Sequence, residues 1–211
     1  MKTSVSVEYE FMRQMLASIL VGLALSGCAP ALHPKPAPRD VHAALAERYP
    51  ASDMSRLAGE LQFAQDTPVE RVELPALAKA LPDVCFYTTE LCTGYYEYPE
   101  VSVAVAVPTQ GPIAVYLSPT YSSSDPAFTT ILASARVSGA SEEQAVAEEI
   151  ARLFAMITYK GEIREQRYEP GRLSADLWHG DLLWRRVSVQ FANGRISSVT
   201  LANGSNGGEG E

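Results

Sequence analysis

The sequence predicts an α+β fold: short N-terminal helices, then a mainly antiparallel sheet with one amphipathic helix packed on it and a C-terminal β-hairpin. Three observations predict this fold. Valines alternate with small residues over 101–107, which is the period of a strand. Apolar residues recur at steps of three and four from Val146 to Ile157, which is the period of a helix. Asn193-Gly194 separates two strand-like runs, as in a hairpin turn.

The first elements are expected to be short helices. Asp40 can cap a helix that extends to about Arg48. A second helix can begin at Ser52 or Asp53, with apolar residues at helical spacing behind it. Proline in the first turn suits a third short helix at 75–81.

Strands are expected from Val84 onward. The alternating run at 101–107 is followed by turn residues at 108–112 and a return strand at 113–117, and then by a polar loop at 118–125. Residues 128–137 are ambiguous. Asp125-Pro126 resembles a helix start, but the β-branched residues Thr129 to Ile131 favour a strand, which we predict here.

The last third contains the amphipathic helix and the hairpin. Ser141 to Gln144 matches a capping box that opens the helix. A polar strand is predicted at 162–169, and the hairpin joins 182–191 to 195–201. A two-residue turn would pair Phe191 with Ile196, whereas a three-residue loop would place Val187 opposite Val199; the sequence leaves both registers open.

The N-terminal segment reads as a secretory signal. An uncharged apolar run at 16–25 follows Arg13 and is shorter than the roughly 20 residues that a bilayer span requires. It ends in Leu-Ser-Gly followed by Cys28, which resembles the lipobox of bacterial lipoproteins. The resemblance implies removal of residues 1–27 and attachment of lipid, palmitate included, to Cys28. Translation can start at Met1 or at Met12.

The same resemblance implies a place in the cell. A lipidated Cys28 would hold the mature chain to a membrane of the cell envelope, because acyl chains partition into bilayers. Ala29 follows the cysteine where Asp would signal inner-membrane retention, so we expect the outer membrane, facing the periplasm, in a Gram-negative host. Residues 28–40 are predicted to be a proline-rich tether, 41–203 a single domain and 204–211 a disordered tail.

Charge and cysteine content limit the function further. The net charge of −8 argues against binding to nucleic acid. Lipidation of Cys28 leaves Cys85 and Cys92, which we predict to form a disulfide in an oxidising compartment. The alternative is a metal-binding pair, but their spacing is wider than that of zinc knuckles. No metal and no cofactor is predicted.

A tyrosine-rich segment follows the cysteine pair. Tyr95, Tyr96 and Tyr98 are predicted to form a partner-binding surface, because alternate residues of a strand point to opposite faces and these three cannot all be buried against one layer. The alternative is packing on a sheet face.

Only one histidine has a carboxylate within three residues on each side of it in the sequence. His179 lies between Asp176 and Asp181, an arrangement that fits either a general base or an ordinary turn between strands. No established catalytic motif is present, and we assign no catalytic residue. The sequence favours a non-catalytic binding or accessory module with an envelope protein as partner. The alternative is a lipid-anchored hydrolase that uses His179 with Asp176 or Asp181.

Overall fold

The computed structural model describes residues 38–51, 61–93, 100–117, 126–158 and 161–204. The chain divides into two compact units, Met1–Pro34 and Lys35–Glu211, and every described residue belongs to the second. The predicted signal peptide, the tether up to residue 37, the helix expected from Ser52, the polar loop at 118–125 and the tail beyond 204 lie outside the described residues.

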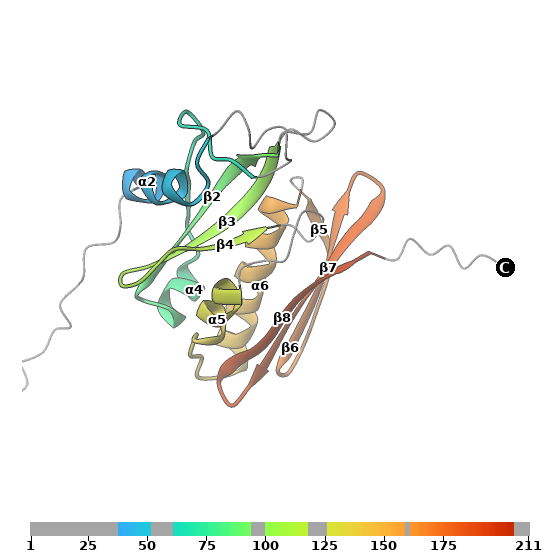
Figure 1. The fold of residues 1–211 in the computed structure, drawn as a ribbon. Coiled ribbons are helices and arrows are strands. Elements are labelled where there is room, and N and C mark those ends of the chain that lie inside the picture. The colour runs from blue at the N-terminus through green and yellow to red at the C-terminus, as the bar shows by residue number, and fades with distance from the viewer. Residues whose placement is uncertain (1–37, 52–60, 94–99, 118–125, 159–160, 205–211) are drawn as a thin grey trace, which may run out of the picture. The chain divides into compact units, whose positions relative to one another are not determined.

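The strands form two separate antiparallel sheets, each with its strands in chain order (Figure 1). Sheet 1 consists of β1 (Glu70–Val72), β2 (Val84–Cys92), β3 (Glu100–Pro108) and β4 (Ala114–Leu117). Sheet 2 consists of β5 (Glu162–Glu169), β6 (Arg172–His179), β7 (Leu182–Ala192) and β8 (Arg195–Asn203). The α+β class is therefore confirmed, with the strands divided between two sheets.

Sheet 1 is covered on both faces. On one face, Val41 and Leu45 of α2 (Pro38–Arg48) pack with Tyr87 and other buried residues of β2 and β3. On the other face, Phe86 joins the core built with α4 (Pro75–Ala80), α5 (Pro126–Ala133) and α6 (Ala140–Ile157). β2 and β3 thus read as nearly continuous apolar runs because both of their faces are buried.

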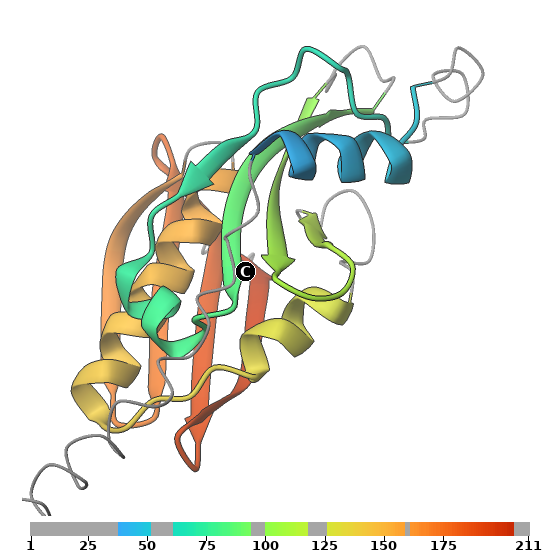
Figure 2. The ribbon, with the colours of Figure 1, turned by 90° about the vertical axis from the view of Figure 1, so that its left-hand side faces the viewer.

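Helix α6 lies between the two sheets (Figure 2). It contacts β3 of sheet 1 and β5, β6 and β7 of sheet 2, and its buried residues cover most of its circumference. Its carboxylates also hold neighbouring elements. Glu149 accepts a hydrogen bond from the backbone N–H of Leu77 at 2.7 Å, which satisfies a free donor at the start of α4. Glu142 pairs with Lys79 of α4 at 2.7 Å.

Sheet 2 is buried on one face only. Alternate residues of β6 and β7, such as Leu173 and Val187, join the core beneath α6, and the residues between them point outward. Its edge strand β5 is dominated by exposed charged residues. The face of sheet 2 that is turned away from α6 is called the outward face below.

Two sequence predictions about helix positions are wrong. Residues 126–133 form helix α5, not a strand, because Phe128 and Leu132 are buried one helical turn apart and the hydroxyls of Thr129 and Thr130 donate back to the carbonyl of Pro126. Such back-bonding lets threonine sit in a helix. The predicted tether also extends too far, since α2 begins at Pro38, where the first turn tolerates proline.

The capping box predicted at Ser141 is also wrong. The helix begins one residue earlier, at Ala140, with Gly139 as its N-cap and no side-chain cap. Instead, the carboxylate of Glu142 accepts hydrogen bonds from both the backbone N–H and the hydroxyl of Ser138, each at 2.7 Å. A serine just before the helix is therefore fixed by the first turn, although not the serine that the motif indicated.

The C-terminal hairpin closes on a two-residue turn. Asn193 and Gly194 both have positive φ, 55° and 69°, and Phe191 faces Ile196. An irregularity beyond this pair then places Val189 opposite Val199, so the three-residue alternative is wrong. Gly194 accepts a hydrogen bond from the N–H of Val137, and a Cβ here would lie 2.8 Å from the Val137 carbonyl oxygen. The turn is therefore docked on the segment that joins α5 to α6.

Candidate functional site

The structure separates His179 from Asp176, one of the two carboxylates near it in the sequence. His179 lies at the exposed end of β6, and Asp176, three residues earlier on the strand, points to the opposite face. The carboxylate of Asp176 is bound to Arg186, and exposed Asp181 pairs with Arg164 at 3.7 Å. The carboxylate of Asp176 is therefore not placed to orient His179 as a general base.

The predicted disulfide is absent and does not fit this fold. Cys85 and Cys92 are both free, and they lie near opposite ends of the single strand β2. At about 3.3 Å per residue their Cα atoms are about 23 Å apart, whereas a disulfide requires less than about 7 Å. A disulfide between them would require residues 85–92 to fold back on themselves, but these residues form a central strand of sheet 1.

Two other predicted sites lie outside the described residues. They are the lipidation site Cys28 and the tyrosines Tyr95, Tyr96 and Tyr98. Both remain predictions.

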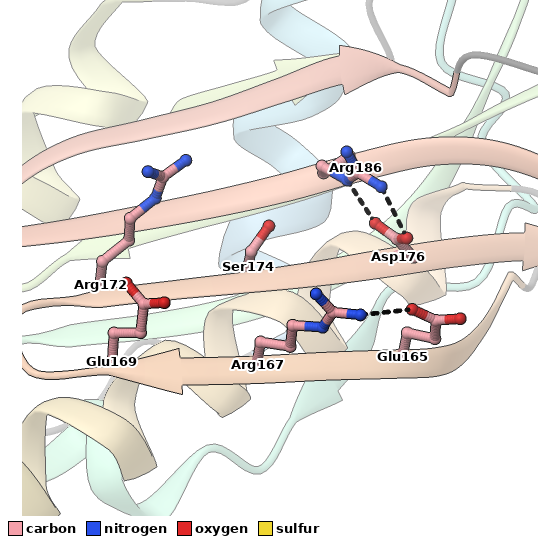
Figure 3. A pocket seen from close by; sticks show the side chains of 7 residues that line it. All are labelled: Glu165, Arg167, Glu169, Arg172, Ser174, Asp176 and Arg186. Atoms are coloured by element: carbon pink, nitrogen blue, oxygen red, sulfur yellow. Dashed lines mark hydrogen bonds and ion pairs between the residues drawn. The ribbon is translucent and has the colours of Figure 1, made fainter.

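A depression of about 260 Å³ lies on the outward face of sheet 2 (Figure 3). Its lining is almost entirely charged and comes from β5, β6 and β7: Glu165, Arg167, Glu169, Arg172, Ser174, Asp176 and Arg186. The three carboxylates balance the three guanidinium groups, so the depression offers both signs of charge and no net charge. We call it the charged depression.

The strand register explains why these residues gather. Three neighbouring rows cross the outward face, each with one residue from β5, β6 and β7. They are Glu165–Asp176–Arg186, Arg167–Ser174–Ser188 and Glu169–Arg172–Gln190. The middle row has small side chains on β6 and β7, with arginine side chains in the rows beside it, and this difference in size produces the hollow.

The strongest contact in the charged depression joins Asp176 to Arg186. Two parallel hydrogen bonds link the groups, Nε to Oδ1 at 2.5 Å and Nη2 to Oδ2 at 2.8 Å. The Asp176 side chain is 11% exposed and that of Arg186 is 50% exposed. Hydrogen bonding to Asp176, followed by the charge of Asp176, raises the pKa of Arg186 above its usual value. This pair is therefore a fixed part of the surface.

The second contact leaves its partners more accessible. Arg167 approaches Glu165 along β5 at 3.7 Å, with most of the Arg167 side chain in solvent. Glu165 also stands directly opposite Asp176, so two carboxylates share the space between Arg167 and Arg186. Guanidinium and carboxylate groups in this arrangement can form charge-assisted hydrogen bonds with polar groups of either charge on a partner.

A wider groove of about 750 Å³ lies between sheet 1 and the end of α6 with β5. Its lining mixes polar residues of sheet 1, such as Thr88 and Ser102, with Met156 and Ile163. Met156 is 41% exposed, which makes it one of two large apolar side chains classed as exposed in the described ranges; the other is Leu182.

Sequence reasoning did not identify the charged depression. The alternation of charged residues in β5 and of Arg172, Ser174 and Asp176 in β6 is visible in the sequence and indicates a solvated face. The pairing of Asp176 with Arg186 depends on the register of β6 against β7, which no local pattern specifies.

Comparison with known proteins gives no relative: no family model, no curated protein and no solved structure matches the chain. Within the described ranges, no helix combines the length and apolar character that crossing a bilayer requires. Among the described residues, no group of three or more histidine, cysteine, aspartate or glutamate side chains is arranged to hold a metal ion.

Proposed function

We propose that this chain is a lipid-anchored lipoprotein of the bacterial cell envelope, and that its α+β domain is a binding or accessory module. The anchor is proposed from the lipobox-like Leu-Ser-Gly before Cys28 and the apolar run that precedes it. One observation supports the binding role. The outward face of sheet 2 exposes charged side chains that are arranged in rows across the strands, with the charged depression at its centre.

The outward face suits a protein partner for two physical reasons. Its side chains stand on paired strands, so a partner orders little backbone when it binds. Arginine is also enriched at protein interfaces, where its planar group forms bidentate contacts. The alternative of an anchored hydrolase loses support, because Asp176 is bound to Arg186 and points away from His179.

The anchor is tested by growing cells with a fatty-acid analogue and comparing wild type with Cys28→Ser. We expect the label in wild type only, and the Cys28→Ser protein in the soluble or unprocessed fraction. Equal labelling of the two proteins would refute the anchor. Recovery of wild type only in inner-membrane fractions would refute the outer-membrane assignment.

The binding role is tested by site-specific photo-crosslinking in cells. A crosslinking residue at position 167 stands in the charged depression, and one at position 47 stands on exposed α2, on the other side of sheet 1. We expect a discrete protein adduct from position 167, and its loss when Arg172→Glu and Arg186→Glu are added. The same adduct from position 47, or no adduct from position 167, would contradict binding at this face.

The tyrosine segment remains a second proposed contact. Replacing Tyr95, Tyr96 and Tyr98 by alanine is expected to remove a co-purifying partner with little loss of melting temperature. A large fall in melting temperature with the partner retained would assign these tyrosines to the core instead.

A further inference from the structure

The turn between β6 and β7 carries an unusual group of side chains. Both tryptophans of the chain, Trp178 and Trp184, lie within it. Leu182 stands in the same turn and is 51% exposed. Arg164 of β5 and Arg185 of β7 complete the group, which we call the tryptophan turn. None of these residues belongs to the charged depression.

Two irregularities in sheet 2 build the tryptophan turn. Between β5 and β6 the pairing skips Arg164, and between β6 and β7 it skips Trp184. Each is an extra residue in its strand. The first lies opposite Asp176 and Leu177 of the intervening strand, and the second lies opposite Leu177 and Trp178. Bulges redirect side chains that a regular ladder would place elsewhere, and they are frequent next to functional sites. Sheet 2 therefore departs from regular pairing on both sides of Leu177, next to Trp178.

Each indole ring carries a guanidinium group. The guanidinium carbon of Arg164 lies 5.3 Å from the centre of the Trp178 ring, and that of Arg185 lies 5.0 Å from the Trp184 ring. The indole Nε1 of Trp178 is shielded from solvent and has no hydrogen-bond acceptor among the described residues. Both indole rings thus stand at the turn with a guanidinium group over one face.

We infer that the tryptophan turn is a bilayer contact: Leu182 enters the headgroup region of the membrane that holds the anchor, with Trp178 and Trp184 at the interface. Tryptophan, and arginine with its long stem along apolar surface, are the side chains that suit this region. Glu162 and Asp181 both pair with Arg164, at 3.4 and 3.7 Å. The turn is therefore close to neutral, and the contact is with net-neutral headgroups.

The length of the predicted tether is consistent with this contact, and to this extent the inference rests on the proposed function. Pro38, the first residue of α2, lies ten positions after Cys28, and ten residues span at most about 36 Å. Helix α2 and the tryptophan turn lie at the same end of the domain in both views (Figures 1 and 2). A bilayer within reach of the tether at that end can meet the turn.

This orientation has a consequence for the charged depression. The strands of sheet 2 would run away from the membrane, so the depression would face sideways into the aqueous compartment and stay accessible to a partner. One exposed leucine is too small an apolar group to hold a protein on a membrane alone. The anchor supplies the local concentration at which so weak a contact forms.

The test uses the lipidated full chain in vesicles of phosphatidylethanolamine and phosphatidylcholine that carry brominated acyl chains. Because the only tryptophans are in the turn, quenching of the intrinsic fluorescence by bromine reports on this site alone. We expect quenching of wild type, and loss of most of it with Leu182→Ser. Met156→Ser is the matched control, since Met156 is the other large apolar side chain that is exposed among the described residues, and it lies in the groove. The quenching of Met156→Ser should equal that of wild type.

Three outcomes would overturn the inference: unquenched tryptophans in the anchored wild type, equal quenching in Leu182→Ser, or an equal loss in Met156→Ser. The first of these leaves the proposed function intact if Cys28 is labelled by lipid. If Cys28 carries no lipid, the proposed function fails, and the unanchored chain is mixed with the same vesicles at high lipid concentration. Leu182→Ser is then expected to weaken partitioning of the unanchored chain roughly fivefold, and equal partitioning of the two proteins overturns the inference.

Discussion

The two sheets of this molecule have the same strand order and different surroundings. Sheet 1 lies between α2 on one side and the helices α4, α5 and α6 on the other, so its central strands are apolar on both faces. Sheet 2 covers α6 with one face and leaves the other to solvent, where charged residues stand in register. The comparison shows that both faces of sheet 1 contribute to the core, whereas the outward face of sheet 2 contributes little to it and is the face that we propose for partner binding.

The largest effect is expected in sheet 1. Tyr87 is fully buried in the centre of β2, so Tyr87→Ala should lower the free energy of unfolding by about 3–5 kcal/mol, by loss of packing and creation of a cavity. Tyr87→Phe keeps the ring and should cost about 0.5–1.5 kcal/mol. Urea denaturation followed by circular dichroism measures both. Equal losses for the two variants would assign the effect to the hydroxyl and not to packing.

A smaller effect is expected from the ion pair of the outward face. Arg186→Ala leaves the mostly buried Asp176 carboxylate without its two hydrogen bonds and should cost about 1–3 kcal/mol. The double variant Asp176→Ala with Arg186→Ala removes the stranded charge and should be more stable than the sum of the single losses predicts. Additive losses in the denaturation curves would show that the two groups act independently.

The acid stability of the helical layer gives a third test. Hydrogen bonds from Lys79 and then Ser138 lower the pKa of Glu142 from 4.5 to about 2. Because the folded pKa lies below the unfolded one, the stabilisation is present above about pH 4.5 and is lost as the pH falls towards 2. Melting temperatures from pH 7 to 2 should fall less steeply in Glu142→Gln than in wild type. Parallel curves would contradict this role of Glu142.

The smallest effect is expected at the rim of the charged depression. Arg167 is largely in solvent and its contact with Glu165 is long, so Arg167→Ala should change the free energy of unfolding by less than about 0.5 kcal/mol. The variant that carries the crosslinking residue at position 167 should therefore be as stable as wild type. A loss of stability comparable to that of Arg186→Ala would show that Arg167 contributes as much to folding as Arg186 does.

Local sequence patterns correctly predicted those elements whose structure depends mainly on the residues within them. The helical spacing from Val146 to Ile157, the alternation in β3 and the Asn193-Gly194 turn all appear in the structure. The prediction failed at 126–133, where burial of Phe128 and Leu132 beneath sheet 1 outweighs the strand preference of the threonines. It failed at Cys85 and Cys92 because the spacing of two cysteines does not show whether the chain between them is extended.

The candidate site was beyond local prediction for a different reason. The rows of the charged depression exist only in one register, and the extra residues Arg164 and Trp184 shift the pairing along the strands. Each shift changes which side chains lie opposite one another, and the alternation of polar and apolar residues in the sequence does not reveal it. The division into two sheets likewise depends on α6 being apolar around most of its circumference, which a search for one apolar stripe does not reveal.

The docking of the last hairpin on the α5–α6 segment concerns the timing of synthesis. The N–H of Val137 donates to the carbonyl of Gly194, and the backbones of Arg136 and Arg195 form an isolated antiparallel bridge. The segment between α5 and α6 therefore gains these contacts only after residues 194 and 195 have left the ribosome. A nascent chain that ends before residue 194 lacks both these contacts and β8. Under the proposed export, such late contacts favour a chain that stays unfolded while it crosses the inner membrane, and folds only after residues 194 and 195 have crossed.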